Sequence, residues 1–73
     1  MSTYIFTFES IHHVLKAEKI LLSHSISFEI IPTPQDLSTN CGMVIRFSEV
    51  DTGQIKKILK EAGLNFEVFK RQQ

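Results

Sequence analysis

The spacing of hydrophobic residues changes repeatedly along this chain, and the order of the changes constrains the fold. Residues 4–8 are aromatic or β-branched, as in a pleated strand. Between Ile11 and Leu22 apolar residues recur about every 3.6 positions, which indicates a helix following a cap at Ser10. Further along the chain, the same patterns predict strands at 27–31 and 43–47, a helix between Asp51 and Gly63 and a strand at 66–69. Residues 70–73 should form a polar tail.

The resulting order, β-α-β-β-α-β, predicts an α+β fold of the ferredoxin-like type. Such a fold has one four-stranded antiparallel sheet with both helices on one face, because the crossovers are right-handed. The length of 73 residues corresponds to a single domain spanning 1–73. Alternate strand residues such as Phe6, Ile45 and Phe47 should face the helices.

The opposite face of this sheet should be open and mixed in character. Ile5, Ile31, Val44 and Phe69 fall on it and would lie together in water unless something covers them. Exposed apolar patches usually mark interfaces, so we expect a homodimer or a partner protein to bind there.

Composition argues against several classes of function. Eight basic and eight acidic residues cancel, whereas nucleic-acid-binding proteins usually carry a positive excess. No apolar run approaches the roughly 20 residues that span a bilayer, and the first residues lack the pattern of a signal peptide. One cysteine cannot form an internal disulfide, so we expect a cytoplasmic protein.

Metal and cofactor sites are not expected either. His12 and His13 are adjacent, so on a helix they point about 100° apart and cannot hold one ion together. The chain has no Cys-x2-Cys or His-x3-His spacing and no glycine-rich phosphate loop.

The single cysteine, Cys41, is the main candidate for chemistry. It ends the one long irregular segment, in which Thr33 and Pro34 are suited to start a short turn. Such a position favours an accessible thiol, and Gly42 would allow a ligand or backbone to approach closely. The alternative is a small apolar residue buried under the loop, which is common for free cysteines.

A reactive thiol needs a positive neighbour. We expect the third strand to begin at the end of the sheet where both helices finish. His24, which ends the first helix, is therefore a weak candidate for that neighbour, the alternative being a solvated histidine.

Several short segments together resemble a known family. They are Tyr-Ile-Phe-Thr-Phe at 4–8, Lys-Ala-Glu-Lys at 16–19, Ile-Ile-Pro-Thr-Pro at 30–34, Ser-x-x-Cys-Gly at 38–42 and Arg-Phe at 46–47. Over roughly residues 3–69 the chain is similar to a bacterial domain family described as selenium/sulfur carrier protein-like. The resemblance implies a carrier or accessory protein, not a stand-alone catalyst, that holds sulfur or selenium on Cys41. Its partner would be a cysteine desulfurase or an enzyme of selenium metabolism. The binding residues around the thiol would be Pro32, Thr33, Pro34, Ser38, Gly42 and Arg46.

Two other classes of function remain open at this stage. One is a non-catalytic interaction or regulatory module that uses the open sheet face, with Cys41 structural. The other is a small-molecule-sensing domain, which follows from analogy of fold alone.

Overall fold

The strands and helices occur in the order that the sequence predicts. A computed structural model describes residues 2–37, 41–48 and 52–72. Over these residues the elements are β1 (Ser2–Phe8), α1 (Ile11–Ser23), β2 (Glu29–Pro32), β3 (Met43–Ser48), α2 (Thr52–Glu61) and β4 (Phe66–Gln72). Asp51, with which the second helix was expected to begin, lies outside the described residues.

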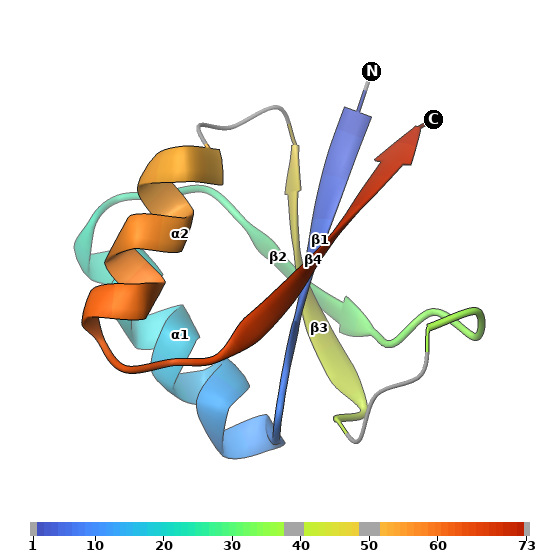
Figure 1. The fold of residues 1–73 in the computed structure, drawn as a ribbon, viewed down its shortest axis with the longest axis horizontal. Helices are drawn as coiled ribbons and strands as arrows, with labels where there is room; N and C mark the ends of the chain where they lie inside the picture. The colour runs from blue at the N-terminus through green and yellow to red at the C-terminus, as the bar shows by residue number, and fades with distance from the viewer. Residues whose placement is uncertain (1, 38–40, 49–51, 73) are drawn as a thin grey trace.

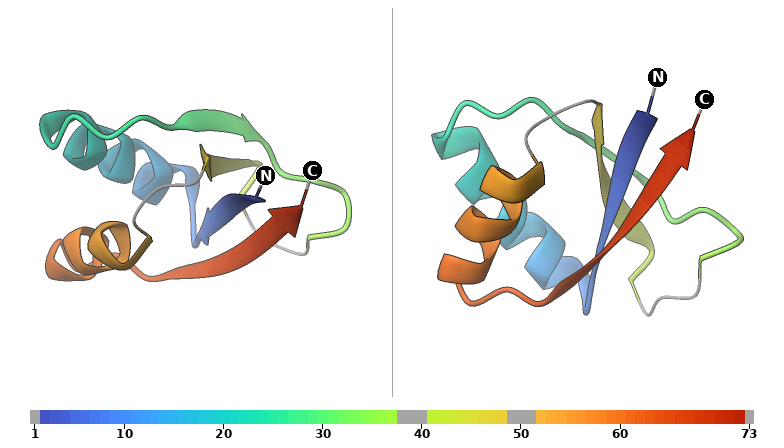
Figure 2. Two further views of the ribbon diagram at one scale, coloured as in Figure 1. Left: turned by 90° about the horizontal axis from the view of Figure 1, so that it is seen from above. Right: turned by 45° about the horizontal axis from the view of Figure 1, so that its top comes forward.

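The described strands form one sheet in the order β2-β3-β1-β4, and every neighbouring pair is antiparallel. Both helices lie on one face of it (Figure 1). The prediction of an α+β ferredoxin-like fold is therefore confirmed. Seen along the strands, α1 covers the β2 side of the sheet and α2 covers the β4 side (Figure 2).

The largest error in element bounds concerns the end of the chain. Residues 70–72, expected to be a polar tail, belong to β4, where Arg71 pairs with Thr3 and Lys70 pairs with Tyr4. β1 begins two residues earlier than predicted and so offers backbone partners for a longer β4. Polar side chains do not prevent this, because β4 is an edge strand with solvent beside it.

Both helices end in the same way. Ser25 after α1 and Gly63 after α2 have φ values of 57° and 79°, which is the left-handed conformation expected after a helix. In each case the next N–H donates to a carbonyl five residues back: Ile26 to Leu21, and Leu64 to Leu59.

The main core lies between the sheet and the helices. Phe6 and Phe47 are fully buried and meet edge to face with ring centroids 5.0 Å apart, while Phe66 stacks on Phe6 at 5.3 Å. The face predicted for the alternate strand residues is therefore correct. The other buried members of this cluster are Phe8, Val14, Ala17, Leu21, Cys41, Ile45, Ile55, Leu59 and Leu64.

The second face of the sheet is not open. Residues 33–37, which we term the strap, follow β2 and lie on the side opposite the helices (Figures 1 and 2). Within the strap, the Asp36 carboxylate contacts the Arg71 guanidinium on β4 at 2.7 Å. β2 and β4 are the two outer strands, so this contact carries the strap across the sheet.

Burial on the strap side corrects the prediction of an exposed apolar patch. Ile5 and Val44 are 4% and 0% exposed, whereas Ile31 and Phe69 are half-buried. The two fully enclosed residues sit on the central strands, where neighbouring strands and the strap shield them. The large apolar side chains that are exposed among the described residues lie elsewhere, on α1: Ile11, Leu15 and Leu22.

Candidate functional site

Cys41 lies directly before β3, and its side chain points into the main core. It is only 3% exposed and belongs to the cluster of buried residues under the helices. Because side chains alternate along a strand, residue 41 continues the helix-facing series of Met43, Ile45 and Phe47. The expectation of an accessible thiol is therefore wrong for this conformation.

Hydrogen bonds hold Cys41 at the start of the strand. Its Sγ donates to the carbonyl oxygen of Met43 at 3.0 Å, and its own carbonyl accepts from Thr33 Oγ1 at 2.7 Å. The Thr33 N–H also donates to the carbonyl of Gly42 at 3.1 Å. Thr33 thus fastens the chain leaving β2 to the chain entering β3, and we call these two bonds the Thr33 clamp.

The turn that the sequence predicts after Thr33 is present, with the N–H of Leu37 donating to the Pro34 carbonyl at 3.1 Å. Thr33 does not cap this turn with its side chain, because its hydroxyl is directed to Cys41. Leu37, which ends this turn, is half-buried.

Gly42 does not have the steric role expected of it. A Cβ built at this position would meet nothing within 4 Å. The described residues around it therefore give no reason why a larger side chain could not stand there.

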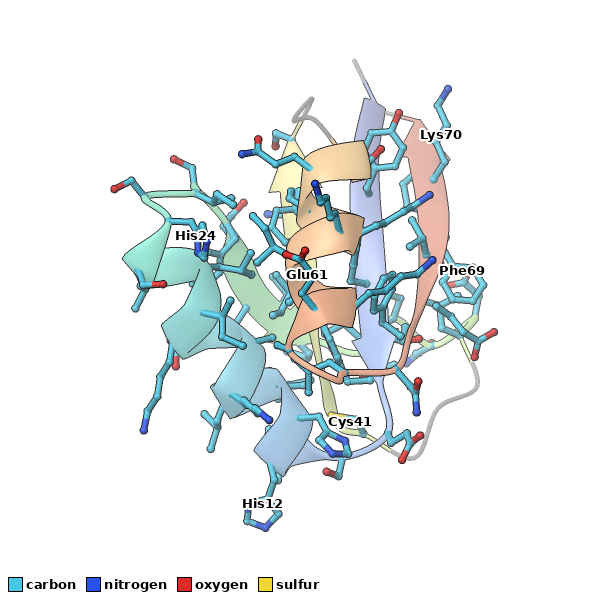
Figure 3. The ribbon with its side chains drawn as sticks, turned by 60° about the vertical axis from the view of Figure 1, so that its left-hand side comes forward. His12, His24, Cys41, Glu61, Phe69 and Lys70 are labelled. Atoms are coloured by element: carbon cyan, nitrogen blue, oxygen red, sulfur yellow. The ribbon has the colours of Figure 1, made fainter. Side chains whose placement is uncertain are left out.

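His24 lies at the wrong end of the molecule to act on Cys41. Figure 3 shows Cys41 near the end of α1 that carries His12, with His24 at the other end of that helix. Because β3 is antiparallel to β1, it starts at the end of the sheet where α1 begins and α2 finishes. His24 instead bonds locally through Nδ1 to the Ile20 carbonyl at 2.9 Å.

This correction changes the electrostatics expected at the thiol's end of the sheet. The start of a helix carries partial positive charge, which favours anions, and only α2 presents its negative end there. His13, in the first turn of α1, is half-buried with its Nδ1 3.4 Å from Ser10 Oγ. Sequence reasoning could have found this arrangement by tracing strand directions.

The residues proposed to surround the thiol divide into two groups. Thr33 and Gly42 lie at the thiol segment: Thr33 donates hydrogen bonds to the carbonyls of Cys41 and Gly42. Arg46 faces the strap side of the sheet, where its Nη2 contacts Glu29 Oε1 at 2.8 Å. Pro32 ends β2 and Pro34 is half-buried in the strap, while Ser38 lies outside the described residues.

The ion pair between Asp36 and Arg71 is the feature that sequence reasoning missed. The hydrogen bond from Arg71 lowers the pKa of Asp36 below its ordinary value of 3.8. One Arg71 nitrogen, Nη2, is buried without a hydrogen-bond partner in the described part of the chain. Neither sequence position indicates the pair, because the polar residues 70–73 predict a tail.

The described residues contain no group of three or more His, Cys, Asp or Glu side chains placed to hold a metal ion. No helix among them is long and apolar enough to cross a membrane.

Fold and site together define a small ferredoxin-like domain whose one thiol is buried and fastened at a loop–strand junction. The chain belongs to the family described as "Putative Se/S carrier protein-like", whose model matches residues 3–70. No curated protein and no solved structure matches the chain.

Proposed function

We propose that this domain carries sulfur or selenium on Cys41 for transfer to a partner enzyme. The observation that carries the proposal is the family match over residues 3–70, which includes the only cysteine of the chain. A chalcogen carrier needs one thiol and a surface for docking, and it does not need a deep pocket. The partner we propose is a cysteine desulfurase or an enzyme of selenium metabolism.

The loading step can be written with its atoms balanced. The Cys41 thiolate attacks the outer sulfur of a persulfide on the donor enzyme, forming a new S–S bond. The S–S bond of the donor breaks, and the donor cysteine leaves as a thiolate. No external oxidant is required, because the transferred sulfur is already at the sulfane level. Selenium would move by the same displacement, giving a selenosulfide.

Burial of Cys41 sets a condition on this chemistry. At 3% exposure the thiol cannot meet a donor cysteine, so the chain around residues 41 and 42 must open during loading. Once the chain closes again, a persulfide in the core would be shielded from cytosolic reductants. Burial therefore suits storage between transfers and opposes free exchange with small thiols.

The test is loading by a cysteine desulfurase in the presence of cysteine, followed by intact mass. The expected result is the addition of one sulfur atom at Cys41, which a reductant removes. Cys41→Ser is the control that should acquire no adduct. The proposal fails if the folded chain stays unloaded by every desulfurase tried while a small-molecule persulfide loads the same chain unfolded in denaturant.

A second candidate function rests on the same burial. Cys41 donates a hydrogen bond to Met43 and belongs to the core cluster, as a structural cysteine would. The domain would then be an interaction module, and two copies or a partner would meet on the strap side at the half-buried Ile31 and Phe69. Phe69→Glu should weaken such association without unfolding the domain, as measured by sedimentation velocity.

A further inference from the structure

The strap joins two features of the molecule that are distant in sequence. At one end it is fastened to the thiol segment, because Thr33 bonds to the carbonyls of both Cys41 and Gly42. At the other end it is fastened to β4, because Asp36 contacts Arg71 at 2.7 Å. Between Thr33 and the end of the strap, the N–H of Leu37 donates to the Pro34 carbonyl and closes a turn.

The position of Cys41 depends on the first of these attachments. Residues 41 and 42 precede β3, and β2 ends at Pro32, so the Thr33 clamp extends the β2–β3 pairing beyond the strands themselves. Only while residue 41 stays in line with β3 does alternation point its side chain into the core. If Thr33 moves away, the thiol segment loses two of the bonds that keep it in register.

We propose that the strap is a latch that controls the exposure of Cys41, with the ion pair between Asp36 and Arg71 as its fastening. Release of Asp36 frees the strap from β4 and so lowers the cost of Thr33 leaving the clamp, after which residues 41 and 42 detach from the end of the sheet. The buried thiol then becomes reachable. The role of this latch in sulfur or selenium transfer rests on the proposed function. The coupling between the ion pair and the exposure of Cys41 does not.

The size of the coupling follows from the exposure of the ion pair. The side chains of Arg71 and Asp36 are 31% and 63% exposed, so solvent screens their attraction. Exposed pairs of this kind shift a local equilibrium by no more than about fivefold. A latch this weak is suitable for release by a docking partner that offers Arg71 a different carboxylate.

The structure supplies a matched control for this idea. Arg46 and Glu29 form a second ion pair on the same face of the sheet, with a contact of 2.8 Å and exposures of 31% and 61%. This pair joins β2 to β3 directly and does not involve the strap. Breaking it removes the same kind of interaction without touching the latch.

The experiment measures the rate at which a small alkylating reagent modifies Cys41 in the folded protein. Arg71→Gln should raise this rate about threefold to fivefold, and Glu29→Gln should leave it within experimental error. Thr33→Val, which removes the clamp hydroxyl and keeps the shape, should also raise the rate. Thr33→Ser, which keeps the hydroxyl, should leave the rate close to that of the original chain.

The dependence of the rate on urea separates local opening from global unfolding. Opening of the strap exposes little surface, so the alkylation rate should rise only weakly with urea at low concentration. The proposal is overturned if Arg71→Gln leaves the rate unchanged, if Glu29→Gln raises it as much, or if the rate follows global unfolding. Alkylation needs no donor enzyme, so the two proposals are tested separately. The latch proposal can be overturned while desulfurase loading succeeds, and loading can fail while the latch proposal holds.

Discussion

The two faces of the sheet are both buried at their centre, but different means achieve it. On the helix side, aliphatic side chains from two helices pack over the sheet residues Phe6 and Phe47. On the strap side, a short irregular segment and one exposed ion pair contribute the cover over Ile5 and Val44. The difference teaches that a four-stranded sheet in so short a chain can be enclosed with only one true core, provided that a loop is secured across its other face.

Cys41 stands at the boundary between these two systems. Its side chain belongs to the helix-side core, whereas its backbone is held by the strap through Thr33. The helix side of the sheet therefore stabilises the surroundings of the thiol, whereas the strap holds the backbone of Cys41 in position.

The largest effect should follow from damage to the helix-side core. Phe47→Ala removes a fully buried ring that meets Phe6 edge to face, leaving a cavity that the neighbours cannot fill. We expect a loss of about 3–5 kcal/mol in the free energy of unfolding, measured by urea denaturation. In a domain of this size that loss approaches the total stability. A loss below about 1 kcal/mol would mean that this face is not the dominant core.

Cys41→Ser comes next in expected size. The serine hydroxyl can still donate to the Met43 carbonyl, but it places a more polar atom in an apolar cluster. We expect a loss of about 1–2 kcal/mol in the free energy of unfolding. If the variant were as stable as the original, the thiol would not belong to the core in solution.

A matched pair of isoleucines compares the faces directly. Ile45→Val on the helix side should cost about 1 kcal/mol, the usual value for a methylene lost from a close-packed core. Ile5→Val on the strap side should cost about half as much, because the strap can settle into the space more easily than two packed helices can. Equal losses, measured in the same urea titrations, would show that the strap is as rigid a cover as the helices.

The smallest effect concerns pH. Since the pKa of Asp36 is lowered in the folded state, its carboxylate stabilises the strap at every pH above its ordinary value of 3.8. That contribution is lost as pH falls below this value and the carboxylate takes up a proton. Amide exchange within residues 33–37 should therefore accelerate below that pH, relative to the exchange in β1. In Asp36→Asn this pH-dependent acceleration should be missing.

Much of the fold was predictable because it depends on local periodicity. The change from a period of two to a period of 3.6 located all the described helices and strands, and alternation assigned Phe6, Ile45 and Phe47 to the correct face. The burial of Cys41 follows from the same alternation continued by one residue pair. The irregular segment before residue 43 instead predicts a loop position for Cys41, where alternation does not apply.

What could not be predicted depends on contacts between distant residues. Nothing in the local pattern says that Asp36 meets Arg71, or that polar residues after Phe69 continue a strand, because both depend on where β1 and the strap lie in space. The misplacement of His24 is different in kind. Strand directions fix which helix end lies near Cys41, so that error was one of topology and the sequence contained the means to avoid it.

The Thr33 clamp also has a consequence for how this domain can vary in length. Thr33 and Gly42 are bonded to each other, so the chain between them leaves and returns at a single point. The entropy of closing such a loop grows only with the logarithm of its length, about 0.6 kcal/mol for each doubling. Peptide inserted between Leu37 and Cys41 would therefore be tolerated by the sheet. One residue inserted after Gly42 would instead shift the alternation at the start of β3 and turn the cysteine out of the core.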